Sequence, residues 1–302
     1  MSGPADLPEA APRRLESGSF SSGLTVPDFA ACLQMGLRPV GLVQGFCAMQ
    51  WGWSSMGYGL GTPYLPAGAY SQTYRCPHGY VGSIEHRTYG QNFEQSWVED
   101  AWLQGFGSAF DRLIEEAQEV GAHGIIGFTD STRALTDSSV VEFHLLGTAV
   151  VVEDGPPPPG GRPWSTYLAG QRLAKLLEAG FMPISVVAAV ASLRVWANCV
   201  TAWLMSGGVG TLQTRAYWGG DSASTAAIDQ ISDAHEAVQA LAREHARRQI
   251  GGDSIHGISI GTTEREAGEG DQVLECILRG TRVRRFKDFD PMPPARPTVR
   301  LT

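Results

Sequence analysis

Two hydrophobic patterns alternate along the chain and predict a mixture of helices and strands. Apolar residues recur at intervals of three and four over 102–117 and again over 228–242, which is typical of amphipathic helices. Shorter helical stripes cover 27–35 and 167–179. Around Phe143, apolar residues alternate with polar ones in the period of two that a half-buried strand shows. The pattern therefore predicts an α+β fold.

Two blocks of sequence recur in the same order, which indicates an internal duplication. LQMGLRPVGLV at 33–43 resembles LEAGFMPISVV at 177–187, at an offset of 144 residues. EFHLLGTAV at 142–150 resembles ECILRGTRV at 275–283, at an offset of 133. Because the offset falls by 11 between the blocks, the first copy carries about 11 extra residues in its middle. We therefore predict two diverged copies of one small domain, each with a sheet, a short helix and a long helix.

Proline and glycine mark the predicted boundary between the copies. The segment DGPPPPGGRP separates them, and polyproline is stiff and extended whereas glycine supplies a hinge. Both ends of the chain are polar or proline-rich, which is typical of disordered tails. The predicted organisation is a tail at 1–22, a first domain at 23–153 with an insertion near 60–95, a linker at 154–164, a second domain at 165–286 and a tail at 287–302.

Composition narrows the class of protein. A hydrophobic content of 43% and a charged content of 18% suit folded domains with buried cores. The formal net charge of −8 offers no basic surface for a phosphate backbone, so nucleic acid is not an expected partner. The five cysteines are scattered and odd in number, which favours a reducing, cytoplasmic location. The apolar segment 181–205 carries Arg194 and Asn198 near its middle, so we expect a buried strand there rather than a membrane span.

The order of these landmarks resembles the YbjQ-like family of heavy-metal-binding domains. The landmarks are a Gly-x-x-Pro entry strand, a glycine-rich middle, a long helix, then GAHGIIG at 121–127 and GTAV at 147–150. HGI at 256–258 and GTRV at 280–283 are weaker counterparts. The resemblance covers about 25–153 and 165–286. It implies α+β domains that assemble into homo-oligomeric rings, typically pentamers, with a role connected to metals.

The strongest local cluster of potential metal ligands is Cys76, His78 and His86. Thiolate and imidazole are the ligands that zinc and other soft divalent metals prefer. Three such groups within 11 residues predict an incomplete metal site, which Glu85, a neighbouring subunit or water would complete. The spacing matches no standard zinc module, and the alternative is a polar loop that contains Cys and His. The second copy has no histidine in the corresponding stretch.

Two pairs of polar residues recur in both copies. His123 and His256 each precede Gly-Ile and follow a predicted helix end. A ring of such imidazoles would bind metal or respond to pH, and the alternative is a turn histidine that bonds nearby carbonyl groups. Glu142 and Glu275 fall on the polar face of a predicted strand, as solvated or interface carboxylates. Acid–base catalysis would require these carboxylates to converge on a partner.

The sequence contains no recognised catalytic motif. It has no G-x-S-x-G elbow, no H-E-x-x-H and no phosphate-binding G-x-x-x-x-G-K-[ST] loop. We therefore predict a non-enzymatic, oligomeric assembly or binding module, with a metal or a small ligand as its cofactor if it holds one. The first alternative is a metal storage or sensing protein that uses Cys76, His78 and His86. The second is an undescribed hydrolase with the glycine-rich middle of the first copy as its cleft.

Overall fold

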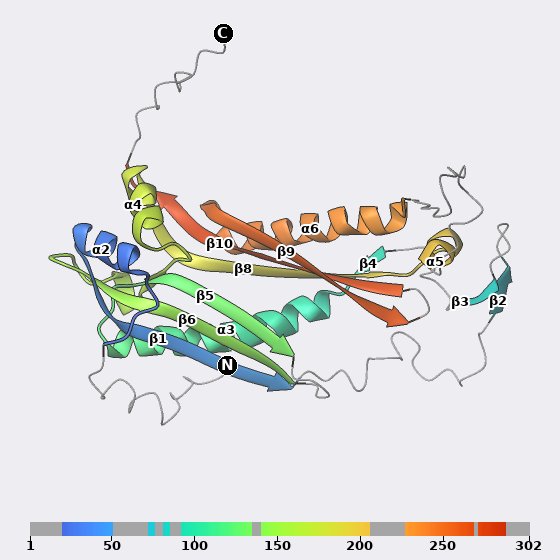
Figure 1. The fold of residues 1–302 in the computed structure, drawn as a ribbon, viewed down its shortest axis with the longest axis horizontal. Coiled ribbons are helices and arrows are strands. Elements are labelled where there is room, and N and C mark those ends of the chain that lie inside the picture. Colours follow the sequence, from blue (N-terminus) through green and yellow to red (C-terminus); the bar gives the residue numbers. More distant parts are fainter. Residues whose placement is uncertain are drawn as a thin grey trace, which may run out of the picture.

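The protein is built from alternating layers of sheet and helix (Figure 1). The computed structural model describes residues 20–50, 72–75, 81–84, 92–134, 140–205, 227–268 and 271–287. Two four-stranded sheets and two long helices make up most of these residues. The predicted α+β class is therefore confirmed.

The N-terminal half supplies a short helix, a strand, a long helix and two strands, in that order. These are α2 (Val26–Gln34), β1 (Leu37–Gln50), α3 (Ser96–Glu119), β5 (Gly124–Ala134) and β6 (Val140–Val152). Three short strands lie between β1 and α3, namely β2 (Gln72–Arg75), β3 (Val81–Ile84) and β4 (Asn92–Glu94). The first sheet has the order β1-β6-β5-β7, in which β7 (Trp164–Ser165) runs parallel to β5 and the other pairs are antiparallel. Among the described strands, β2 and β3 form a separate two-stranded antiparallel sheet.

The C-terminal half presents its main elements in the same order. After the 3₁₀ turn η2 (Pro159–Gly161) and β7, these are α4 (Gly170–Glu178), β8 (Phe181–Val195), α5 (Cys199–Met205), α6 (Asp229–Ile250), β9 (Ser254–Gly268) and β10 (Asp271–Arg285). The second sheet has the antiparallel order β4-β8-β10-β9. Strand β4 comes from the N-terminal half, so the two halves share this sheet.

Strand β8 is buried on both faces, and its sequence explains why. Val186, Ala188 and Val190 pack into the cluster that contains α3. The alternate residues, among them Val187 and Ala189, pack into a second cluster with α6. A strand covered on both faces requires a nearly continuous apolar run, which β8 has. The predicted buried strand is thus confirmed within 181–195, and among the described residues no helix is long and apolar enough to cross a membrane.

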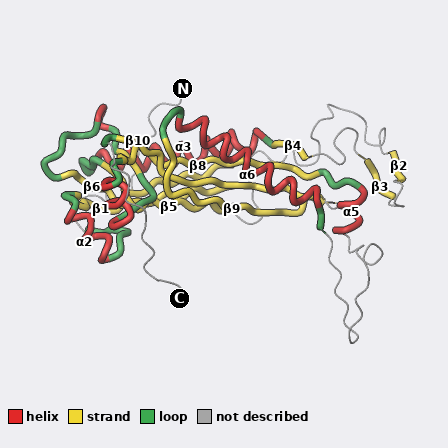
Figure 2. Tube along the Cα trace, turned by 90° about the horizontal axis from the view of Figure 1, so that it is seen from above, coloured by secondary structure: helices red, strands yellow, loops and turns green. Residues whose placement is uncertain are grey.

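Among the described helices, one long helix covers the first sheet and lies on its inner face, while α2 and α4 cover part of the other face at one end. Its inward residues, such as Val43, Phe143 and Leu145, are buried against α3. On the outward face of β1 and β6, the side chains of Phe46 and Leu146 are 42% and 39% exposed. Helix α3 therefore lies between the two sheets, while α6 covers the far face of the second sheet (Figures 1 and 2).

The short helices α2 and α4 pack together at one end of the molecule. They enclose a third apolar cluster, which includes Cys32, Ile126, Leu168 and Leu173. Burial raises the pKa of the Cys32 thiol, so this cysteine stays a neutral core residue. This cluster joins the N-terminal and C-terminal halves a second time.

Details of strand pairing recur in the two halves at the offsets of the repeated sequence blocks. The pairing is irregular next to Pro39 in β1 and next to Pro183 in β8, where proline removes a backbone donor. Gly147 in β6 and Gly280 in β10 each lie so close to the neighbouring strand that an added Cβ would overlap an isoleucine side chain. The two proline positions are 144 residues apart and the two glycine positions 133.

Candidate functional site

His245 lies where the two halves of the chain meet. It belongs to α6, and its Nδ1 is 2.8 Å from the carbonyl oxygen of Val190 in β8. Two carboxylates of the N-terminal half complete its surroundings. Glu99 Oε1 is 2.9 Å from Nδ1, and Glu94 Oε1 is 3.2 Å from Nε2. Across the described parts of the chain, these residues form the one group of three potential metal ligands whose donor atoms lie within 4.8 Å of one another.

The two glutamates are placed by the junction between β4 and α3. Glu94 ends β4 and pairs with Leu193 of β8, and Glu99 lies in the first turn of α3. Between them, the backbone N–H of Gln95 donates to the carbonyl of Ser192 at 2.8 Å, and its side chain accepts from the Ser192 hydroxyl at 3.0 Å. This double contact fixes the start of α3 against β8, and with it both carboxylates.

A second polar contact secures the other end of β4. Gln230 Nε2 donates to Asn92 Oδ1 at 3.2 Å, and Asn92 Nδ2 donates to the backbone carbonyl of Gln230 at 3.3 Å. Gln230 also donates to the carbonyl of Trp196 at 2.9 Å. Strand β4 is therefore tied to α6 as well as to β8.

The cluster places two carboxylates beside one imidazole. Nδ1 of His245 faces two acceptors, so it donates, and Nε2 faces a third acceptor in Glu94. Burial raises the pKa of Glu99, whereas the charges of His245 and Arg248 act to lower it. A second proton on the imidazole or a bound cation would satisfy Nε2 and both carboxylates together.

The contact of His245 with β8 has a counterpart in the N-terminal half. Arg112 of α3 donates to the backbone carbonyl of Phe46 in β1. Phe46 and Val190 are 144 residues apart, and Arg112 and His245 are 133 apart. The two long helices therefore dock onto their strands in the same way, and the C-terminal contact also gathers two carboxylates.

The uncovered face of the first sheet carries a small polar and aromatic group. Phe46 meets the ring of His144 edge to face at 4.6 Å between centroids. His144 Nε2 is in turn 3.7 Å from Glu142 Oε2. This exposed group, with Leu146 beside it along β6, gives the face a mixed character rather than a purely apolar one.

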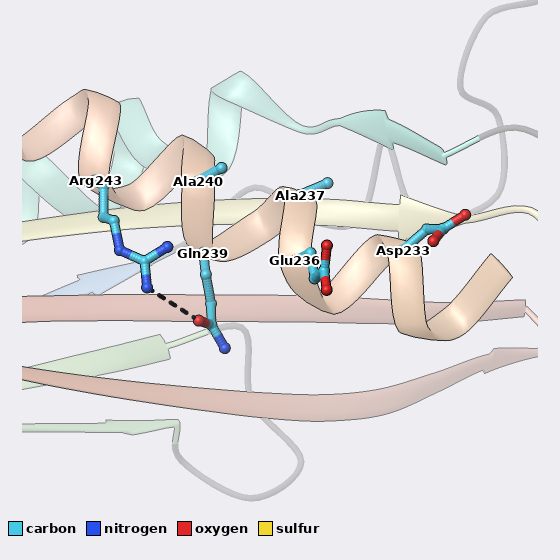
Figure 3. Close-up of a pocket in the computed structure, with 6 residues that line it drawn as sticks. All are labelled: Asp233, Glu236, Ala237, Gln239, Ala240 and Arg243. Carbon is cyan, nitrogen blue, oxygen red and sulfur yellow. Dashed lines mark hydrogen bonds between the residues drawn. The ribbon is translucent and has the colours of Figure 1, made fainter. Parts of the chain in front are cut away.

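A solvent-open depression runs along the outer side of α6 (Figure 3). It is lined by Asp233, Glu236, Ala237, Gln239, Ala240 and Arg243. The guanidinium of Arg243 donates a hydrogen bond to the side-chain oxygen of Gln239 at 3.3 Å, and Asp233 and Glu236 lie nearer the N-terminus of the helix (Figure 3). An open surface with separated charges does not enclose a substrate, so it is better suited to contact with a macromolecule.

The structure describes some of the residues that the sequence predicts as metal ligands and not others. Cys76, His78 and His86 lie outside the described residues. His123 accepts a hydrogen bond at Nδ1 from the backbone N–H of Val152 at 3.2 Å, which is a structural role at a turn. His256 lies against the ring of Phe181, with centroids 5.0 Å apart.

Strand register corrects the pairing of His123 with His256. His256 lies opposite Thr281 of β10, and the residue opposite the corresponding Thr148 of β6 is Ile126. His256 therefore occupies the position of Ile126, three residues beyond that of His123. The identical His-Gly-Ile tripeptides occupy different positions because α3 ends two residues later than α6, counted from Arg112 and His245, and because the connection from α3 to its strand is one residue longer.

Glu142 and Glu275 each lie on a strand that pairs with a strand on either side. Glu142 lies between Ala48 and Arg133, and Glu275 lies between Ser192 and Thr263 in the same strand order. Glu275 accepts from Arg265 at 3.1 Å. Neither carboxylate converges with the other, since they belong to different sheets.

Comparisons with known proteins identify one distant relative. The chain is 25% identical over 199 residues to the encapsulin nanocompartment protein Rv1762c of Mycobacterium tuberculosis. The alignment covers 65% of this chain and 61% of that protein, so the chain spans less than two thirds of its relative. No family model and no solved structure matches the chain.

Proposed function

We propose that this protein is a non-enzymatic assembly module made of two diverged YbjQ-like copies, and that copies of the chain associate through the uncovered face of the first sheet. The observation that carries this proposal is the unequal covering of the two sheets. In the part of the chain that the structure describes, the second sheet has a long helix on each face, whereas the first has a long helix on its inner face alone. More specifically, we propose that the chains form a closed ring, with five chains as the expected number.

The contact between the two halves is the model for the contact between chains. Val190 is buried where β8 meets the layer of α3, and its counterpart in β1 is the exposed Phe46. The outward face of the first sheet therefore corresponds to the face of the second sheet that α3 covers. A second chain that presented its α6 layer there would repeat the arrangement found within the chain.

The opposite end of the chain offers a matching surface. Phe128 in β5 and Ile258 in β9 each follow a glycine with positive φ at an irregularity in strand pairing. Phe128 is buried, 5.1 Å from the ring of Tyr167, whereas Ile258 is 54% exposed. Each end of the chain therefore exposes the counterpart of a residue that is buried between the halves. Such a head-to-tail contact generates rings when its rotation closes.

The proposed contact between chains is more polar than the one inside the chain. At the positions of Phe106 and Phe110 in α3, helix α6 carries Gln239 and Arg243. These polar residues face the solvent-open depression of Figure 3. They suit the mixed face formed by Glu142, His144 and Phe46, which provides a carboxylate for Arg243 as well as apolar area. The name of the relative, a nanocompartment protein, also favours assembly.

Charge placed on the uncovered sheet face is expected to prevent association. The double substitution Phe46→Lys and Leu146→Lys should convert the wild-type oligomer to a smaller species at micromolar concentration, because it sets two ammonium groups in the proposed contact. Native mass spectrometry and sedimentation velocity measure the change. Leu33→Lys is the matched control, since Leu33 is 49% exposed and lies on helix α2 rather than on the strands of the sheet. A monomeric wild type, or an oligomer that survives the double substitution, would contradict the proposal.

A further inference from the structure

We propose that His245, Glu94 and Glu99 form a binding site for one divalent metal ion of the zinc, cobalt and manganese class. The proposal concerns a different part of the molecule from the uncovered sheet face and does not depend on assembly. It also differs from the loop site predicted at Cys76, His78 and His86. The three donors are already grouped by the fold, with no rearrangement of the backbone needed to bring them together.

The donor set suits this class of metal. One imidazole nitrogen with two carboxylate oxygens is a borderline-to-hard set, which favours zinc, manganese or cobalt over the thiolate-seeking metals. Three protein ligands with a fourth position left to water is the usual arrangement of an open site.

The imidazole is oriented as a metal ligand requires. Nδ1 faces two acceptors, the Val190 carbonyl at 2.8 Å and Glu99 Oε1 at 2.9 Å, and these fix the tautomer that leaves the lone pair on Nε2. Because Glu99 Oε1 lies on the Nδ1 side, Glu99 would join an ion at Nε2 through a rotation of its side chain. The lone pair of Nε2 then points toward Glu94, whose Oε1 is 3.2 Å away. Gln95 and Ser192 hold the segment that carries both carboxylates, so the ligands are supported by a second set of hydrogen bonds.

The exposure of the three side chains increases from His245 to Glu99 to Glu94, so an ion can reach the cluster from the solvent on the side of Glu94. The side chains of His245, Glu99 and Glu94 are 1%, 17% and 36% exposed. The imidazole therefore forms the floor of the site and Glu94 its solvent-facing side, where water would complete the coordination. Because the ligands come from β4, α3 and α6, a bound ion would also link the two halves.

The same geometry without a metal describes a doubly protonated imidazole held between two carboxylates. The two states differ in a measurable way, since only the first has saturable affinity for an ion. Full-length protein is first treated with chelator, and then titrated with Zn²⁺ and with Co²⁺ by calorimetry and by native mass spectrometry. The expected result is one ion per chain, together with cobalt absorption bands that are typical of nitrogen and oxygen ligands.

Substitutions assign the ion to this site. Glu94→Gln, at the exposed side of the cluster, should weaken binding by about 100-fold or more, and His245→Gln should abolish it. His235→Gln is the matched control, because His235 lies on the same helix 3.9 Å from Glu264 and should leave affinity unchanged. Cys76→Ser should also leave it unchanged. If His245→Gln fails to fold, Glu94→Gln alone decides.

Two outcomes would overturn the metal site. One is the absence of saturable binding at millimolar Zn²⁺, which would assign the cluster to a protonated ion pair. The other is affinity that persists in Glu94→Gln and disappears in Cys76→Ser, which would move the ion to the loop. Both outcomes leave the assembly proposal untouched, because the oligomer mass is read from the metal-free sample in the same experiment.

Discussion

Gly45→Ala is expected to lower the free energy of unfolding by about 3 kcal/mol, at the upper end of the usual cost of overpacking. Gly45 lies in the middle of β1, opposite Leu145, where α3 crosses the sheet. A Cβ at this position would overlap the carbonyl oxygen of Ala109 and lie 2.9 Å from the backbone nitrogen of Leu113. Both are backbone atoms of a helix, so no side-chain rotation relieves the overlap and the helix itself must shift.

Urea denaturation followed by circular dichroism measures this change. Gly41→Ala in the same strand is the control, because an added Cβ there meets nothing within 4 Å and the expected change is small. Gly105→Ala on α3 should fall between the two, since its Cβ would overlap only the ring of Phe143, a side chain that has some freedom to move. A Gly45 variant as stable as the Gly41 variant would show that α3 does not lie this close to β1.

The helix–strand contact at Gly45 shows which parts of the fold the sequence determines locally. Helices α3 and α6 follow from apolar periodicity, and β8 from a continuous apolar run, because these signals lie within one element. Strand β4 does not follow in the same way. Its three residues, Asn92–Glu94, carry too little pattern, and they pair with Val195, Arg194 and Leu193, about 100 residues away. Pairing at this distance is decided by packing of the whole fold.

The candidate site shows the same limit. His245 continues the apolar stripe of α6 four residues after Leu241 and three after Ala242, so the sequence marked its position as core without marking it as a ligand. A buried polar residue on such a stripe needs hydrogen-bond partners, so the sequence indicates that His245 has them. It does not identify these partners, because Glu99 lies 146 residues earlier in the chain. The shared His-Gly-Ile instead matched two positions that the strand register separates.

Arg279→Ala is expected to destabilise the protein by about 3 kcal/mol, which is typical of breaking a buried ion pair from one side. Arg279 of β10 bonds both carboxylate oxygens of Asp130 in β5, with its Nε 2.8 and 2.7 Å from them. The side chain of Asp130 is 2% exposed, so removal of the guanidinium leaves a buried charge with only the Tyr167 hydroxyl, at 3.1 Å, as a described side-chain donor. The pair joins the two sheets directly, and its loss should loosen one half from the other.

The size of this effect depends on the charge that is left behind more than on the contact that is lost. The double substitution Asp130→Asn and Arg279→Leu removes both charges, and it keeps a carbonyl that accepts from Tyr167. We therefore expect it to be more stable than Arg279→Leu alone, as in other buried pairs replaced as a unit. The exposed pair of Arg162 and Asp111, 3.4 Å apart, is the control, and Arg162→Ala should change stability by less than about 1 kcal/mol. If the double variant were as unstable as the single one, the cost would lie in the lost contact between the sheets rather than in the buried carboxylate.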